Sequence, residues 1–224
     1  MENLRAEAAL LSNQGELVEY QGDFERALQL YQKAINLSEE TGNKDKEIGY
    51  RANLGRAQVL LGAYDQAVET LEGLINSLPP KTYLLSEIHI SLAEAYLGQG
   101  RPDLALSAGQ VAFVNAKLHD QVVMGLAWAM LGRIAVQMGA AVHPDPNEDP
   151  AYDARDCFKQ SLEGISSSRS QWERASVLWR WAEAELLQGD KELGEKMWCE
   201  ARDIFTSLNL PMMVARMEAG DNKE

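Results

Sequence analysis

Residues 11–34 read LSNQGELVEYQGDFERALQLYQKA, and the spacing of small and apolar residues in this stretch decides the fold. Gly22 lies between two segments in which apolar residues recur every three or four positions, as on one face of a helix. A glycine at such a place supplies the left-handed backbone that ends a helix. Gly15 and Ala27 flank it at mid-helix positions, where small side chains let two helices approach closely. The stretch therefore predicts two antiparallel helices joined by a short turn.

The same pattern recurs along the whole chain. The turn glycines are Gly22, Gly62, Gly100, Gly139 and Gly189, at spacings of 40, 38, 39 and 50 residues. Seven positions before each of them lies a small residue: Gly15, Gly55, Ala93, Gly132 and Ala182. Repetition at this period is typical of stacked helix pairs. We therefore expect an all-α, right-handed α-solenoid of about five antiparallel helix pairs, closed by a C-terminal capping helix.

The pattern also predicts the domain organisation, a single repeat domain over residues 1–224. Its expected units are 3–41, 45–78, 82–117, 119–165 and 170–207, with a cap at 211–219. First helices are expected near 3–21, 45–61, 82–99, 119–138 and 170–188. Second helices are expected near 24–41, 64–78, 103–117, 152–165 and 191–207.

The fourth unit carries an insertion at 140–151, AAVHPDPNEDPA. Its prolines forbid helix, and its acids predict an exposed acidic loop. Such a loop could dock a basic partner, or it could be a tolerated surface insertion, because added loop length costs little free energy. We favour the surface insertion.

Composition limits the possible partners and the compartment. The formal net charge is -13, from 34 acids and 21 bases spread over both halves of the chain. Such a surface repels phosphate backbones, so we expect no nucleic-acid binding. The N-terminus lacks the basic start and apolar run of a signal peptide, and the apolar runs are short, so we expect no membrane contact. Cys157 and Cys199 are read as free core thiols of a cytoplasmic protein.

The sequence shows no candidate catalytic or metal-binding constellation. His89, His119 and His143 fall in different units, without an acid or cysteine at ligand spacing. Neither cysteine belongs to a CxxC motif, and no phosphate-binding GK[ST] is present. We therefore expect a protein that is not an enzyme and that has no cofactor and no metal.

These repeats resemble the tetratricopeptide repeat. The resemblance is strongest at Leu11, Gly15, Val18, Gly22, Ala27, Tyr31 and Ala34. Gln14 and Gly109 depart from the pattern, since large apolar residues are usual at both places. The period exceeds the family's usual length of about 34 residues. The chain is therefore similar to the longer-helix repeats of kinesin light chains and of the tails of bacterial signalling regulators.

The resemblance implies a concave groove, lined by the first helices, that binds a protein or peptide partner. The groove residues expected from it are Asn13, Glu16, Tyr20, Asn53, Arg56, Glu94, Met130, Arg133, Trp179, Arg180, Glu183 and Leu187. We expect the end near Trp179 to make the main contact, because exposed aromatic residues dominate binding hot spots.

Acidic and basic residues alternate along this groove, and two interpretations remain open. Neighbouring units could neutralise each other through Glu–Arg pairs. Alternatively, Arg56 and Arg133 could receive carboxylates of a bound peptide.

The expected function is a cytoplasmic scaffold or regulatory module, which could be part of a larger signalling protein. The alternative is a peptide or small-ligand sensor domain of a larger signalling or transcription regulator. An uncapped first helix at the N-terminus also favours homo-oligomers.

Overall fold

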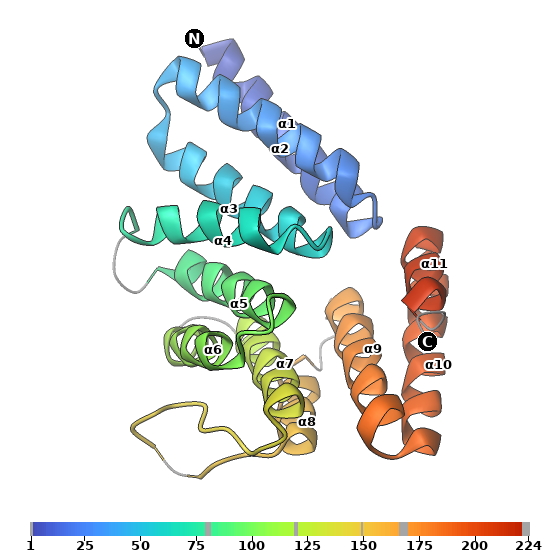
Figure 1. Ribbon diagram of the computed structural model, residues 1–224. Helices are drawn as coiled ribbons and strands as arrows, with labels where there is room; N and C mark the ends of the chain where they lie inside the picture. Colours follow the sequence, from blue (N-terminus) through green and yellow to red (C-terminus); the bar gives the residue numbers. More distant parts are fainter. Residues whose placement is uncertain (1, 79–81, 119–120, 149, 166–169, 221–224) are drawn as a thin grey trace.

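A computed structural model describes residues 2–78, 82–118, 121–148, 150–165 and 170–220, and within them the fold is entirely helical apart from one isolated β-bridge. Helices that follow one another pack side by side in a curved stack (Figure 1). The helices are α1 (Glu2–Tyr20), α2 (Phe24–Thr41), α3 (Lys44–Leu60), α4 (Tyr64–Ile75), α5 (Tyr83–Gly98), α6 (Pro102–Ala116), α7 (Gln121–Met138), α8 (Ala154–Gly164), α9 (Gln171–Gln188), α10 (Lys191–Ser207) and α11 (Pro211–Gly220).

The expected helices agree with these bounds to within a few residues, and the predicted all-α solenoid is confirmed. The largest difference is at α4, which ends at Ile75 although the pattern extended it to residue 78. Beyond Ile75 the amides of Ser77 and Leu78 bond to carbonyls three residues back, so the α-helix gives way to tighter turns. The start of the fourth unit, with His119, lies outside the described residues.

Four of the five turn glycines have the expected backbone. Gly22, Gly62, Gly100 and Gly139 have φ of 93°, 76°, 71° and 63°, values that side chains other than glycine rarely adopt. Gly189 has φ of -129°, so the expectation of a left-handed turn is wrong in the fifth unit.

Within a unit, a large side chain of the second helix packs on the small residue of the first. A Cβ atom on Gly15 would lie 2.5 Å from Cε1 of Tyr31, and one on Gly55 would lie 2.5 Å from Cδ2 of Leu71. The second helices therefore lie too close for any side chain at these glycines, which explains why the small residues repeat with the turns.

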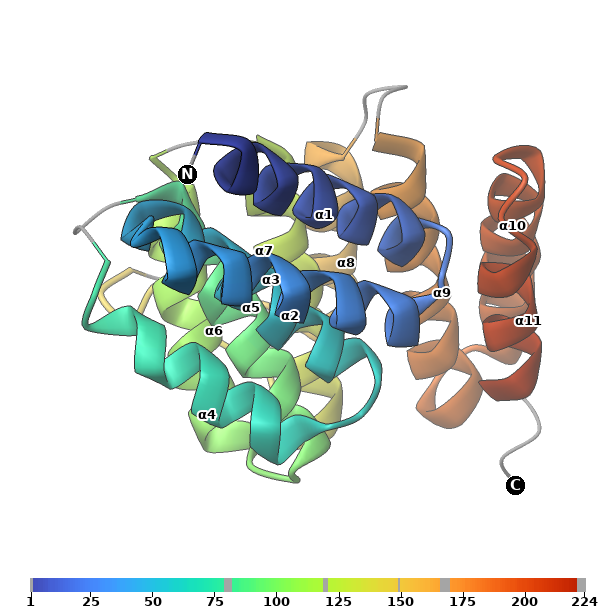
Figure 2. The same ribbon diagram turned by 90° about the horizontal axis from the view of Figure 1, so that it is seen from above.

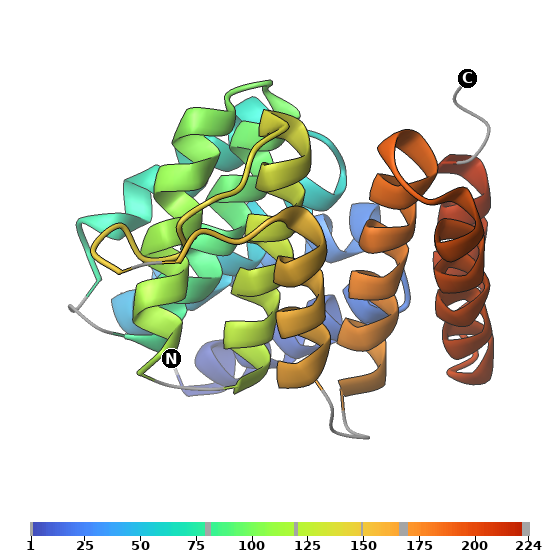
Figure 3. The ribbon, with the colours of Figure 1, turned by 90° about the horizontal axis from the view of Figure 1, so that it is seen from below.

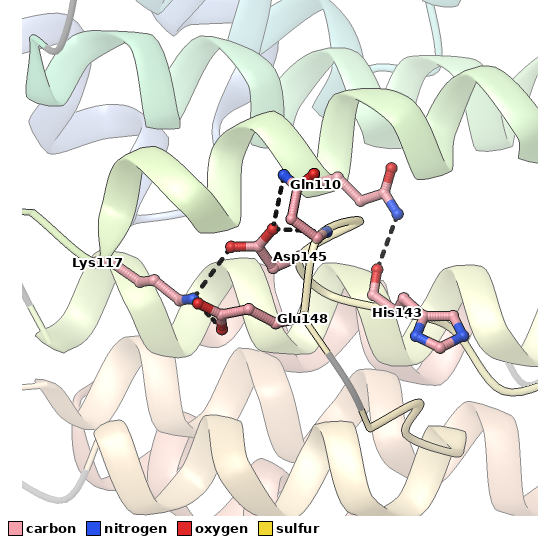
Figure 4. Close-up of polar contacts among 6 residues, drawn as sticks. Gln110, Lys117, His143, Asp145 and Glu148 are labelled. Carbon is pink, nitrogen blue, oxygen red and sulfur yellow. Dashed lines mark hydrogen bonds and ion pairs between the residues drawn. The ribbon is translucent and has the colours of Figure 1, made fainter.

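The acidic insertion is docked on the solenoid, so the expectation of an exposed loop is wrong for part of it. Val142 and Tyr152 exchange backbone hydrogen bonds of 2.9 and 2.8 Å, and Val142 is 2% exposed. Lys117, at the end of α6, bonds to Asp145 at 3.2 Å and to Glu148 at 2.8 Å (Figure 4). The base of the loop is thus a small β-bridge, and Asp145 and Glu148 are held by the solenoid itself.

A second contact holds the same loop next to the β-bridge. Gln110 of α6 donates a hydrogen bond of 2.8 Å to the carbonyl oxygen of His143 (Figure 4). The connection between α7 and α8 lies over α6 when the molecule is seen from below (Figure 3). Because two of its acids already have a lysine partner, the loop offers less free charge than a docking loop for a basic protein would need.

The two cysteines differ in their surroundings. Cys157 is fully buried, and burial raises the pKa of its thiol to about 12. Cys199 is exposed, so the expectation that it is a core residue is wrong. It lies on α10, whose other face carries the buried Met197 and Ala201.

One helix, α7, is long and apolar enough to cross a membrane by length and composition, among the residues that the structure describes. Half of that helix is buried inside the fold. Ala127, Leu131 and Ile134 have no exposed surface, as expected of a helix at the centre of a stack.

The last unit turns back to meet the first. Trp172, at the start of α9, stacks on Tyr20 with ring centroids 5.7 Å apart, and its indole nitrogen donates to the Tyr20 carbonyl at 3.2 Å. Arg216 of α11 donates to the carbonyl of Gly22 at 2.9 Å, and its guanidinium lies 4.1 Å from the Phe24 ring centroid. The α1–α2 turn therefore lies beside α9 and α11 (Figures 1 and 2).

We call this contact the clasp, made by Tyr20, Gly22, Phe24, Trp172, Met213 and Arg216. The repeat pattern predicts a groove that stays open along one side. The structure instead joins the two ends of the solenoid, so that the first helices enclose a ring.

A buried carboxylate joins the fourth and fifth units. Arg155 of α8 donates to both oxygens of Glu185 of α9, at 2.7 and 2.6 Å. The indole of Trp181 and the backbone amide of Asp190 donate to the same carboxylate, at 3.0 and 2.9 Å. With Arg155 first, these donors favour the charged form and hold the pKa of Glu185 down at about 2.

Acid should therefore weaken the fold through Glu185. Its folded pKa lies below the ordinary value, so its contribution is fully present above the ordinary glutamate pKa and is lost as the pH falls towards 2. We expect this loss to be about 2 kcal/mol of unfolding free energy. Urea unfolding at several pH values should show it in the native chain, and Glu185→Gln should be less stable at neutral pH with a flatter pH profile. If the exposed-site control Glu69→Gln flattens the profile equally, Glu185 is not the group responsible.

Candidate functional site

Two adjacent cavities lie on the inner face of the ring. The larger has a volume of about 820 Å³ and is lined by α1, α3, α5 and the start of α9. The smaller has a volume of about 410 Å³ and is lined mainly by α7, α9 and α11. The wall between them consists of residues that line both, namely Leu60, Ile90, Glu94, Leu126 and Trp172.

The larger cavity is acidic and aromatic. Its acidic residues are Glu16, Glu19, Asp45, Glu87, Glu94 and Glu173, against which stand only Lys46 and Arg56. Its aromatic residues are Tyr20, Tyr50, Tyr83 and Trp172. The excess of carboxylates makes the potential inside this cavity negative.

Ion pairs between units account for part of this charge. Arg56 of α3 bonds to Glu19 of α1 at 2.6 Å, and Arg133 of α7 bonds to Glu94 of α5 at 2.7 Å. Neighbouring units thus neutralise each other, as the first of the two interpretations of the alternating charges expects. Glu16 does not join this series, because it accepts a hydrogen bond of 3.0 Å from Asn53.

The charges of the remaining carboxylates shift the pKa values of their neighbours, including a tyrosine. Burial raises the pKa of Glu87, Arg56 opposes this rise, and the charge of Glu16 adds to it. The negative charge of Glu87 is also the first cause that raises the pKa of the Tyr83 hydroxyl. Both shifts have the sign that an excess of negative charge produces.

The smaller cavity is apolar, with arginines at its wall. Met130 of α7 and Trp179 of α9 line it, and the Arg180 guanidinium lies 4.8 Å from the Trp179 ring centroid. Burial acts to lower the pKa of Arg180, but the charges of Glu94 and Glu183 raise it. Burial acts to raise the pKa of Glu94, and Arg133 and Arg180 lower it. Both shifts favour the charged forms of Arg180 and Glu94.

Most of the groove residues expected from the sequence line one of the two cavities. The larger is lined by Asn13, Glu16, Tyr20, Asn53, Arg56 and Glu94. The smaller is lined by Glu94, Met130, Arg133, Trp179 and Arg180.

Two expected groove residues lie outside both cavities. Glu183 forms an ion pair with Arg180 at 3.1 Å but is not part of either lining. Leu187 is 79% exposed and is also absent from both linings. The neighbouring Leu186 packs against Gly194 of α10, which turns Leu187 towards solvent.

Sequence reasoning missed several residues of the larger cavity, among them Tyr83, Glu87 and Glu173. Glu87 could have been found, because it lies seven residues before Glu94 and so shares one face of a helix with it. Glu173 had no such signal, because it reaches the cavity only through the clasp.

The two histidines that the structure describes, His89 and His143, do not form a site together. His89 is half-buried on α5, its Nδ1 has no hydrogen-bond partner, and burial lowers its pKa. His143 lies in the docked loop, far along the chain from His89. In the described part of the chain, no group of three His, Cys, Asp or Glu side chains could hold a metal ion.

Comparison with known proteins agrees with this architecture. The family model of the tetratricopeptide repeat matches residues 6–78. A thermophilic TPR protein from Thermus thermophilus superposes with a TM-score of 0.64 at 17% identity, covering 95% of this chain and 99% of that one. The TPR-like repeats of a proposed kinesin light chain from Podospora anserina superpose with a TM-score of 0.54 at 18% identity, covering 92% and 96%. A search of curated proteins gives no match.

The small residues at the helix crossings, the glycine turns and the family match all point to one architecture. The helices beyond residue 78 continue the same stack. Residues 6–78 match the family model of the tetratricopeptide repeat, and the rest of the described chain continues the same helical solenoid.

Proposed function

We propose that this chain is a scaffold that binds a segment of a partner protein inside its ring and catalyses no reaction. The observation that carries the proposal is the pair of adjacent cavities on the inner face, of about 820 and 410 Å³. Both volumes are typical of ligand sites in proteins. The tetratricopeptide fold supports a protein-interaction role, because such solenoids offer a concave surface to partners.

The smaller cavity is proposed to hold an apolar anchor residue of the partner. Met130 and Trp179 provide an apolar surface, and Arg133 and Arg180 provide hydrogen-bond donors beside it. Aromatic and arginine residues in a desolvated pocket contribute most of the binding energy at many interfaces. The end of the groove near Trp179 is therefore proposed as the main contact.

The clasp supports a second candidate, a ligand sensor. Trp172 lines both cavities and also stacks on Tyr20, so a ligand in either cavity would touch the contact that closes the ring. A sensor should change its Trp172 fluorescence or melting temperature with a small molecule, whereas a scaffold should respond only to polypeptides.

The clasp also supports treating the five units and the cap as one domain, because the last unit contacts the first. The cysteines Cys157 and Cys199 are free thiols, which fits our proposal of a cytoplasmic module of a larger signalling protein.

Replacing Trp179 with alanine should weaken binding of groove peptides at least tenfold, about 1.4 kcal/mol. Peptides selected from a random library on the native protein provide the ligands, and titration calorimetry provides the affinity. Trp198→Ala is the matched control, because Trp198 lies on α10 outside both cavities. If the two variants lose affinity equally, or if neither loses any, the smaller cavity is not the main contact.

A further inference from the structure

We propose that the larger cavity selects a basic segment of the partner, with a lysine or arginine side chain inside the cavity next to the apolar anchor. This inference rests on the proposed function and adds the chemistry of the bound segment. It concerns a cavity that the Trp179 experiment does not test.

Charge is the first argument. Six carboxylates and two basic side chains line the cavity, and Arg56 is already bonded to Glu19. Among the described residues, no lysine or arginine forms an ion pair with Glu16, Glu87 or Glu173. A cation that enters the cavity would therefore be attracted by several carboxylates without displacing an existing ion pair. An anion would be repelled.

The aromatic lining is the second argument. Tyr20, Tyr50, Tyr83 and Trp172 surround the same space. An ammonium or guanidinium group over the face of such rings gains about 0.5–2 kcal/mol. Carboxylates and aromatic faces together therefore favour a cation over a neutral polar group of the same size.

Glu87 is the third argument, because this lining residue interacts electrostatically with both Glu16 and Tyr83. It is half-buried on α5, and burial is the first cause that raises its pKa. Arg56 compensates its charge only in part. A bound cation beside Glu87 would replace the solvation that burial removes, and binding should then lower the pKa of this carboxyl group.

The wall between the cavities points to a polypeptide and not to a small free amine. Leu60, Ile90 and Leu126 form an apolar divide with the acidic cavity on one side and the apolar cavity on the other. A peptide can place a basic side chain on one side and an apolar side chain on the other. A free oligoamine would use only the acidic side.

Three capped, fluorescein-labelled peptides of equal length test the proposal. Each carries one central phenylalanine, flanked by lysines, glutamines or glutamates, and binding to the native chain is followed by anisotropy. We expect the lysine peptide to bind at least tenfold more tightly than the glutamine peptide, and the glutamate peptide to bind most weakly. Spermine, measured as a competitor, represents a free oligoamine.

A pair of double variants separates the cavity from the overall charge of -13. Glu16→Gln with Glu87→Gln removes two negative charges inside the cavity. Glu40→Gln with Glu69→Gln removes two exposed charges from the outer helices α2 and α4. Circular dichroism should show that both retain the fold, and we expect only the first to weaken the lysine peptide, by about tenfold.

Each other outcome overturns the proposal. Equal losses in the two double variants would mean attraction by the surface as a whole. Equal affinity for all three peptides, or no binding of any, would mean that the cavity does not select charge. Competition by spermine at the affinity of the lysine peptide would assign the cavity to a small amine. If Trp179→Ala still weakens the selected peptides in these cases, the proposed function stands and only the charge selection fails.

Discussion

Replacing Phe24 with alanine is expected to open the ring and to lower the free energy of unfolding by about 3 kcal/mol, as for other buried phenylalanines. Phe24 is the first residue of α2 and is 4% exposed. The phenyl group of Phe24 is covered by Arg216, and the neighbouring Gly22 packs against Met213. Loss of this phenyl group removes the apolar centre of the clasp, so the fifth unit should separate from the first. Urea unfolding gives the energy, and small-angle X-ray scattering gives the radius of gyration.

Phe113→Ala is the matched control for this experiment. Phe113 is 5% exposed and packs edge-on against Trp128, at 4.8 Å between ring centroids, away from the clasp. It should cost a similar free energy without changing the radius of gyration. If Phe24→Ala leaves the radius of gyration as unchanged as Phe113→Ala does, the clasp does not hold the ring closed.

Replacing Tyr31 with alanine should destabilise the first unit by about 3–5 kcal/mol. The Tyr31 ring is fully buried and packs directly against Gly15, where there is no room for a side chain. Its hydroxyl donates to Glu19 at 2.9 Å, and Glu19 also accepts from Arg56 at 2.6 Å. The variant thus creates a cavity and removes one donor from a buried carboxylate.

Tyr31→Phe separates these two effects. It keeps the ring and removes only the hydroxyl, so it should cost about 1–2 kcal/mol. Urea unfolding of both variants gives the two energies. Burial raises the pKa of the Tyr31 hydroxyl, so the donor is present at all ordinary pH values. Equal losses in the two variants would show that packing on Gly15 contributes nothing, contrary to the interpretation of the small residues.

The solenoid could be predicted because its signals are local and repeated. A positive-φ glycine such as Gly62 ends each first helix in four of the five units, and a small residue such as Gly55 marks each helix crossing. Each unit contains all the residues needed to recognise it. The same phase of the repeat placed Asn53, Glu94 and Arg133 on the inner face, where they line the cavities.

The clasp could not be predicted, because it joins residues far apart in the sequence. Arg216 and Gly22 are 194 positions apart, and neither belongs to a motif of the other's unit. Closure depends on the small rotation between successive units, summed over the whole stack, and no single residue determines that sum. Glu173 and Arg216 entered the cavities only through this closure.

Two smaller features could not be predicted from the repeat pattern. The position of Leu187 in the repeat matches that of groove residues, but it gave no indication that this side chain lies outside both cavities and is exposed to solvent. The prolines of the insertion correctly excluded helix, but they gave no indication that Lys117 holds Asp145 and Glu148 against α6.

The central claim is that the two ends of the solenoid meet and enclose the cavities. Pulsed electron paramagnetic resonance tests it directly, with nitroxides attached to cysteines at the exposed Gln21 and Met212, in a background where Cys157 and Cys199 are replaced by serine. A Cβ atom on Gly22, next to Gln21, would lie 3.2 Å from Cβ of Met212. The closed ring predicts one narrow distribution at the short end of the measurable range. A broad distribution centred at long distances would contradict it and would return the chain to an open solenoid.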